Sequence, residues 1–284
     1  MFYIQKKIWL MFDFKEVIDF MNIFFREMKA NRKSLIIWCI SMILFILLCM
    51  VKYSGISQTG QSFNDLMAGM PQALIVIFGL STFNLAEMSG YFGVLFLYFL
   101  LIVAIHSSML GANIISKEER DKTAEFLLTK PVSRNKIVTY KLLAAFVNIL
   151  ILNIVTLVSS LLIVPGYNKG ASITSFIVLL MIGMFFVQLM FLFIGSGLGA
   201  LAKYPKGAAS AATGVLLTTY LLSMLIDLND KLTNLKYITP FKYFEAKQIL
   251  SDGKLEPVFI ALSIIIITVF ICLTYTFYKK RDVK

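Results

Sequence analysis

Six long runs of uncharged, apolar residues constrain the fold of this chain more than any other feature. They contain no Asp, Glu, Lys or Arg, and they cover residues 34–51, 91–115, 142–164, 171–202, 207–226 and 257–278. About 20 apolar residues cross the roughly 30 Å hydrocarbon layer of a bilayer as a helix. With 58% hydrophobic and only 15% charged residues, the chain is too apolar for a soluble globular domain. The sequence therefore predicts a polytopic membrane protein with six spans.

The spans are predicted to be helices, because the strands of a membrane β-barrel alternate apolar and polar residues. Residues 264–267, by contrast, are four consecutive isoleucines. The fold class is therefore all-α. The three cysteines and the single histidine show no metal-ligand spacing, so we expect no metal site.

Basic residues are distributed unevenly among the segments between the runs. The N-terminal segment, the 116–141 segment, the 203–206 loop and the C-terminal tail hold all but seven of the 27 Lys and Arg residues. Because basic loops stay in the cytoplasm, we predict that both termini and the 116–141 segment are cytoplasmic. The short apolar stretch within 66–86 is too short to span, and we place it as an interfacial or re-entrant helix on the outer face.

The first 33 residues are predicted to form an amphipathic helix, because apolar residues recur at steps of three and four. Those positions are Leu10, Phe14, Val17, Met21, Phe24 and Met28. We expect residues 1–33 to lie on the membrane lipids at the inner surface, with 34–284 forming the six-helix membrane domain. A coiled-coil partner helix is the alternative. Anionic lipids account for the basic charge, so no nucleic-acid partner is expected.

Two other segments carry patterns with more than one interpretation. The outer loop 227–256 is long enough for a structured cap, and its aromatic patch, 237–244, suits either membrane anchoring or contact with substrate. Small residues at 195–200 and 207–214 would let helices approach closely. The short break at Tyr204 and Pro205 favours an antiparallel pair of the fourth and fifth runs within the chain, with contact between two copies as the alternative.

The 116–141 segment combines mixed charge with a compact apolar knob. Residues 118–125 carry both signs of charge, residues 126–128 read Phe-Leu-Leu, and Pro131 then stops the helix. Ser133 follows as a predicted N-cap of the next helix. A short helix with an apolar knob between two spans suits docking into a partner's groove, although a solvated loop fits the pattern equally.

Residues 118–134 (EERDKTAEFLLTKPVSR) resemble the cytoplasmic motif of ABC-2 type transporter permeases, E-E-x-x-x-G-T-x-E-x-L-L-x-x-P-[VI]-S-R. Lys122 stands where that motif has Gly. Segments 70–79, 239–244 and 280–283 are also similar to the family, so the resemblance extends over nearly the whole chain.

The resemblance implies the membrane subunit of a bacterial ABC exporter, located in the plasma membrane. Such a subunit pairs with a second copy or a sister permease and receives motion from a separate ABC ATPase subunit. The residues implied in ATPase docking are Glu118, Glu119, Thr123, Glu125, Phe126, Leu127, Leu128, Pro131, Val132, Ser133 and Arg134. The chain has no G-x-x-x-x-G-K-[ST] motif, so we expect no cofactor here and ATP and Mg on the partner. This chain is then not an enzyme.

Polar residues inside the runs are candidates for a substrate pathway, because each is costly in lipid unless it faces protein or water. They are His106, Asn113, Asn148, Asn153 and Gln188. Hydrogen bonds between helices are the alternative role, and the more favoured one.

Three other function classes remain as alternatives. A secondary transporter ordinarily has ion-coupling carboxylates at mid-membrane, and the runs contain none. An intramembrane protease would use Glu118 and Glu119, but one histidine cannot complete a metal site. The third is a non-transporting scaffold or sensor subunit of ABC-2 architecture. The identity of the cargo does not follow from these residues.

Overall fold

The computed structural model describes residues 2–59, 83–123 and 132–280, with positions 69, 71, 74 and 75 between the first two ranges. Within these ranges the chain is helical and has no strand, which confirms the all-α prediction. The α-helices are α1 (Phe2–Thr59), α4 (Met88–Arg120), α6 (Arg134–Ile163), α7 (Thr174–Leu201), α8 (Ala208–Leu228), α9 (Ala246–Asp252) and α10 (Pro257–Lys280). The 3-10 helices are η1 (Val164–Gly166), η2 (Pro205–Gly207), η3 (Asp230–Tyr237) and η4 (Pro240–Lys242).

Six helices in the described part of the chain are long and apolar enough to cross a membrane. Each of the six uncharged runs falls on one of them, so the predicted number of spans is confirmed. The re-entrant helix predicted within 66–86 lies almost entirely outside the described residues.

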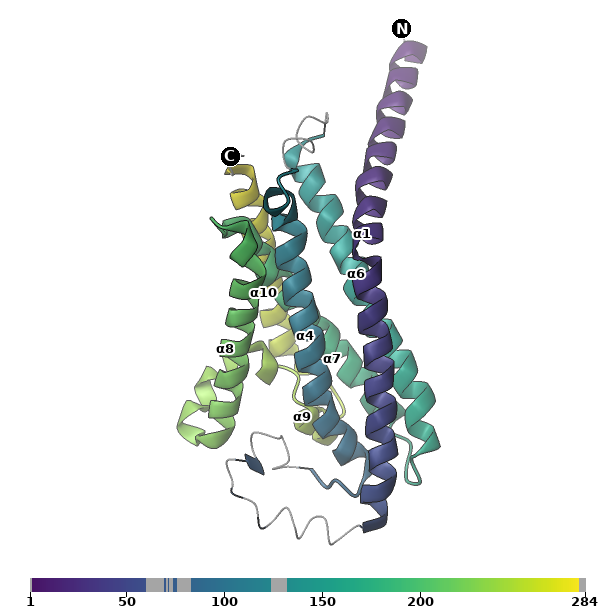
Figure 1. Cartoon of the computed structure of the whole chain (residues 1–284), viewed down its shortest axis with the longest axis vertical. Helices are drawn as coiled ribbons and strands as arrows, with labels where there is room; N and C mark the ends of the chain where they lie inside the picture. Colours follow the sequence, from purple (N-terminus) through teal and green to yellow (C-terminus); the bar gives the residue numbers. More distant parts are fainter. Residues whose placement is uncertain are drawn as a thin grey trace.

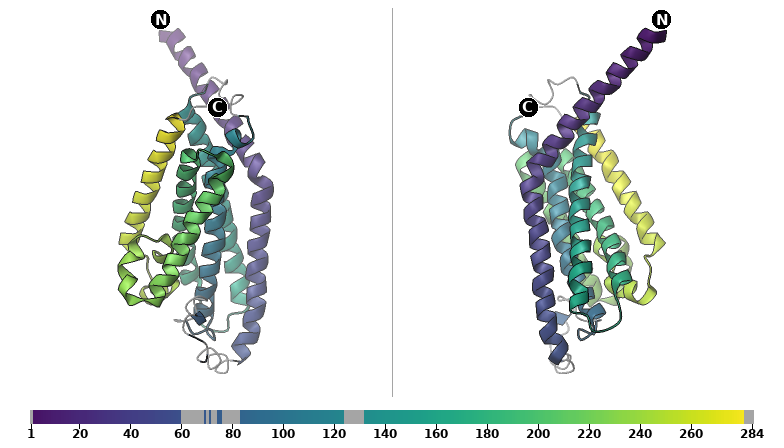
Figure 2. Two further views of the ribbon diagram at one scale, coloured as in Figure 1. Left: turned by 60° about the vertical axis from the view of Figure 1, so that its left-hand side comes forward. Right: turned by 90° about the vertical axis from the view of Figure 1, so that its right-hand side faces the viewer.

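The helices form an elongated bundle whose two ends differ (Figure 1). At one end, here called the terminal end, α1 begins, α10 ends, and α4 and α6 meet the 116–141 segment. At the opposite end, the cap end, η3, η4 and α9 lie beneath the spans. In both views of Figure 2 the N-terminal part of α1 projects beyond the other helices at the terminal end. The start of α1, the end of α10 and the 116–141 segment therefore share one end of the bundle. The cytoplasmic location of that end stays a prediction.

The predicted arm, residues 1–33, is continuous with the first span. A single helix runs from Phe2 to Thr59 without a break near residue 33, because neither Gly nor Pro occurs before Gly55. The location of the arm at the membrane surface stays a prediction.

Helices α4 and α7 form the centre of the bundle and touch through their backbones. A Cβ atom built on Gly111 of α4 would lie 2.0 Å from the Leu192 carbonyl oxygen of α7. One built on Gly195 would lie 2.2 Å from the Ser108 carbonyl oxygen. The predicted close approach therefore lies within the chain. However, Gly195 and Gly199 of α7 approach the backbone of α4 rather than α8, and Gly197 faces Phe270 of α10. Glycines on both helices allow the close approach of α4 and α7.

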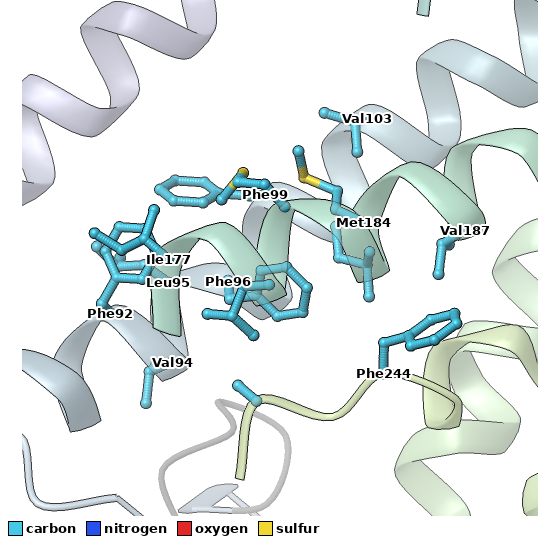
Figure 3. Close-up of a cluster of buried hydrophobic side chains, with 14 of the residues drawn as sticks. Phe92, Val94, Leu95, Phe96, Phe99, Val103, Ile177, Met184, Val187 and Phe244 are labelled. Atoms are coloured by element: carbon cyan, nitrogen blue, oxygen red, sulfur yellow. The ribbon is translucent and has the colours of Figure 1, made fainter. Parts of the chain in front are cut away.

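Large apolar side chains fill the rest of the space between α4 and α7. Phe92, Phe96 and Phe99 from α4 are buried there, as are Met184 and Val187 from α7 (Figure 3). Bulky aromatic rings thus pack the cap-end half of the interface, while small residues allow backbone contact in the half toward the terminal end.

The predicted cap is present as η3, η4 and α9, and most of its aromatic patch points inward. Phe244 stacks on Phe186 with ring centroids 5.6 Å apart, and Tyr243 stacks on Phe259 at 5.1 Å. Only Tyr237 in this group of rings is well exposed. The buried rings extend the core, so lipid anchoring is not their main role, while contact with substrate stays a prediction.

One buried lysine fixes the cap. Lys242 is ion-paired with Asp227, at the end of α8, and with Glu245. Burial alone would lower the pKa of Lys242, but the Glu245 and Asp227 carboxylates outweigh this effect and hold it above its ordinary value. The charged form of the lysine therefore ties the cap to α8.

Candidate functional site

The 116–141 segment leaves α4 through a Schellman motif. The amide of Thr123 donates to the Glu118 carbonyl at 2.8 Å, and the amide of Lys122 donates to the Glu119 carbonyl at 3.3 Å. Lys122 occupies the left-handed position of this motif with φ of 58°. The ABC-2 motif has Gly at this position, and Gly adopts this conformation without strain.

Replacing Lys122 with Gly is expected to stabilise the end of α4 by about 0.5 to 1 kcal/mol, the strain of a left-handed lysine less the added chain entropy of glycine. Hydrogen exchange of the amides in 117–123 would measure the change. The matched control is Lys136→Gly in the first turn of α6, which should speed local exchange instead. Faster amide exchange in Lys122→Gly would contradict the assignment of a strained, left-handed Lys122 at the end of α4.

The segment rejoins the bundle at the start of α6. Ser133 is the N-cap, as predicted, and its hydroxyl accepts a hydrogen bond from the Lys136 amide at 3.4 Å. Arg134 donates to the Lys279 carbonyl of α10 at 3.0 Å, and Val132 packs beside Ile137. The start of α6 is therefore held against the end of the last span.

Between these two points, Glu125, Phe126, Leu127, Leu128 and Pro131 lie outside the described residues. Among the described docking candidates, Thr123 and Ser133 are exposed and Glu119 is partly exposed. Their contact with a partner stays a prediction.

Glu118 belongs to a network of five charged residues, three of them buried, which is here called the ion cluster: Arg26, Glu27, Lys117, Glu118 and Lys141. Glu118 pairs with Lys141, which is completely buried, and with Arg26 at 3.3 Å. Glu27, also completely buried, pairs with Lys117 at 2.6 Å and with Arg26 at 3.0 Å. The Glu118 side chain is only 7% exposed, so it can affect docking only through the position of its neighbours.

The cluster was not predicted, because Lys117 and Lys141 counted only as basic residues between the spans and Glu27 was given no role. A signal was available in their spacing. Glu27 follows buried Ile23 by four residues, and Lys141 follows buried Ile137 by four. A charge on the buried stripe of a helix needs a partner of opposite sign, but chain order does not select that partner, because Glu119, Asp121 and Glu125 all lie nearer to Lys141 along the chain than Glu118 does.

The candidate pathway residues lie at separate places. Asn153 donates to the Gln188 side-chain carbonyl at 3.0 Å, which joins α6 to α7. Asn148 donates to the Ala144 carbonyl at 2.7 Å, and Asn113 accepts from Arg120 at 3.0 Å. His106 is buried, with its ring centroid 5.1 Å from that of Trp38. Within the described part of the chain, Asn153 and Gln188 are the only two of the five that bond to each other, in the alternative role of linking helices.

A cavity of about 200 Å³ lies near the cap end, between α4, α8 and the cap. Phe96, Leu100, Tyr220 and Phe241 contribute apolar walls, and Lys242 with its carboxylate partners provides a polar edge. None of the five pathway candidates lines it. The cavity can hold a small, mainly apolar group with one polar end.

The family comparison agrees with this architecture. The model of a family described as ABC-2 family transporter protein matches residues 21–283. The chain belongs to the ABC-2 transporter family. No curated protein matches the chain. The family match covers all six spans, the ion cluster and both ends of the 116–141 segment.

Membership defines the broad role of this ABC-2 chain. It is a multi-pass membrane protein and a permease-type component of a transporter. In this family the membrane subunit is generally not the catalyst, and it works with an ABC ATPase subunit.

Proposed function

We propose that this ABC-2 chain is the permease subunit of a bacterial exporter and that it couples ATP hydrolysis on a separate subunit to movement of cargo. The family match over residues 21–283 is the observation that carries the proposal. ATP and Mg bind to the partner, and this chain needs no cofactor of its own. A second copy or a sister permease completes the membrane part.

The 116–141 segment is the proposed contact with the ATPase subunit. Two capped helix ends support it: the Schellman motif at Lys122 and the N-cap at Ser133. A segment held at both ends can pass a displacement to α4 and α6 rather than absorb it. Closure of two ATPase subunits would then rock the two permease halves against each other.

Coupling can be tested in proteoliposomes that contain the permease and its ATPase subunit. Replacing both Glu125 and Leu127 with Ala is expected to abolish ATP-driven transport while the permease still inserts and assembles. Tyr204→Ala is the matched control, because Tyr204 is 81% exposed on the α7–α8 loop at the same end. Full coupling in the double variant, or transport without any ATPase subunit, would overturn the proposal.

The proposal also sets the orientation in the plasma membrane. A cysteine at the exposed position Thr123 should react with a membrane-impermeant maleimide only after cells are opened. A cysteine at Tyr237, 48% exposed in the cap, should react in intact cells. The native cysteines would first be replaced. Labelling of Thr123→Cys from outside would reverse the orientation and contradict docking to a cytoplasmic ATPase.

A further inference from the structure

The ion cluster is an unbroken chain of alternating charges across three helices. Its order is Lys117, Glu27, Arg26, Glu118 and Lys141, each in contact with the next. Glu27 and Arg26 belong to α1, Lys117 and Glu118 to the last turn of α4, and Lys141 to α6. The chain of contacts therefore joins the first span to both ends of the 116–141 segment.

Stability alone does not account for burying these charges. Glu27 and Lys141 are completely buried, and removing two charges from water offsets much of their mutual attraction. Apolar residues of similar volume commonly stabilise such a site as well or better. What an ion pair adds is a preferred relative position of the groups that carry it, because its energy depends on direction and distance.

The contacts of Lys141 are of this directional kind. Besides pairing with Glu118, its ammonium donates to the Ile114 carbonyl at 2.8 Å, one turn before Glu118 on α4. Lys141 therefore fixes the depth of α6 relative to the last turns of α4. Arg26 repeats the arrangement on α1, where it bridges Glu27 and Glu118. A shift of either end of the segment against α1 breaks at least one ion pair that contains a buried carboxylate.

We propose that Glu27 and Lys141 are positioning residues, which through the ion cluster fasten α1, the end of α4 and the start of α6 into one unit. A displacement of the 116–141 segment then reaches the first span directly, as well as α4 and α6. The mechanical consequence rests on the proposed function, whereas the fastening itself is a property of the permease alone.

The decisive variant replaces one buried pair by apolar residues of similar size, Glu118→Leu with Lys141→Met. It leaves no buried charge without a partner, because Glu27 keeps Lys117 and Arg26. The fold is expected to persist. The cap control is Tyr243→Phe, which removes the hydrogen bond from the Tyr243 hydroxyl to the Tyr237 carbonyl in the cap and changes neither the ion cluster nor a residue that lines the cavity.

The fastening is tested on the purified permease without the ATPase subunit. Spin labels on cysteines at Thr123, after α4, and at Asn135 of α6, both exposed, report the distance between the end of α4 and the start of α6 once the native cysteines are replaced. We expect a narrow distance distribution in the parent and the cap control, and a broad one in the Glu118→Leu/Lys141→Met variant. Equally narrow distributions in the parent, the cap control and the double variant would show that the ion cluster does not fasten these elements.

The consequence is tested in the reconstituted complex. Cargo moved per ATP is expected to fall at least about fivefold in the Glu118→Leu/Lys141→Met variant, the lower end of typical coupling between sites. The cap control should move as much cargo per ATP as the parent. If the distance distribution broadens but the cargo moved per ATP does not change, the ion cluster does not transmit the movement. If the Glu125 and Leu127 variant also couples normally, the proposed function fails instead, while the distance measurement still decides the fastening.

Discussion

Gly111→Leu is expected to prevent the permease from folding, with a loss of more than about 4 kcal/mol in stability, a size reached when a core cannot accommodate a substitution. The reason is the 2.0 Å separation between a Cβ atom at this position and the Leu192 carbonyl oxygen. Backbone cannot move aside as a flexible side chain can. The measurement is the yield of monodisperse protein in detergent and the midpoint of its thermal unfolding.

Gly214→Leu is the matched control for this prediction. Gly214 is also a helical glycine in a span, but a Cβ atom there has nothing within 4 Å. We expect its yield and unfolding midpoint to match the parent. Normal folding of Gly111→Leu would show that the two helices are further apart than described.

Lys141→Met alone is expected to destabilise the permease by about 3 to 5 kcal/mol, because removing one partner of a buried ion pair leaves the other charge uncompensated. Glu118, only 7% exposed, would keep just the more distant Arg26. Titration with a denaturing detergent, followed by loss of helix signal, measures the difference.

Adding Glu118→Leu to Lys141→Met should recover most of that loss, because the second change removes the uncompensated carboxylate. A double variant that is no more stable than Lys141→Met would contradict this explanation. The pair of experiments therefore separates the cost of an unpaired charge from the cost of altered packing.

Spans could be predicted from this sequence because the bilayer imposes a one-dimensional requirement. A run such as 257–278 needs length and absence of charge, and both can be counted along the chain. The N-cap at Ser133 was predictable for the same reason, since capping depends on neighbours a few residues away. Such features need no knowledge of which helices lie side by side.

Pairings between helices were beyond prediction because they depend on rotation and depth of each helix. Gly195 indicated that another helix approaches closely. The sequence could not identify Ser108 on α4 as its partner, because small residues occur in several spans. Lys141 likewise stood at the edge of a run without an obvious partner. The inward direction of Tyr243 and Phe244 depended on the folding of the cap beneath α7 and α10, which the composition of the loop does not encode.

The backbone contact between α4 and α7 also limits how this ABC-2 permease can move. Two helices that meet through carbonyl oxygens and glycines cannot slide or turn against each other without first separating, so they move as one rigid unit. Contacts through side chains alone, such as those of α8, tolerate small shear movements. Any movement within this chain therefore has to come from its outer helices, which can shift against the α4–α7 pair.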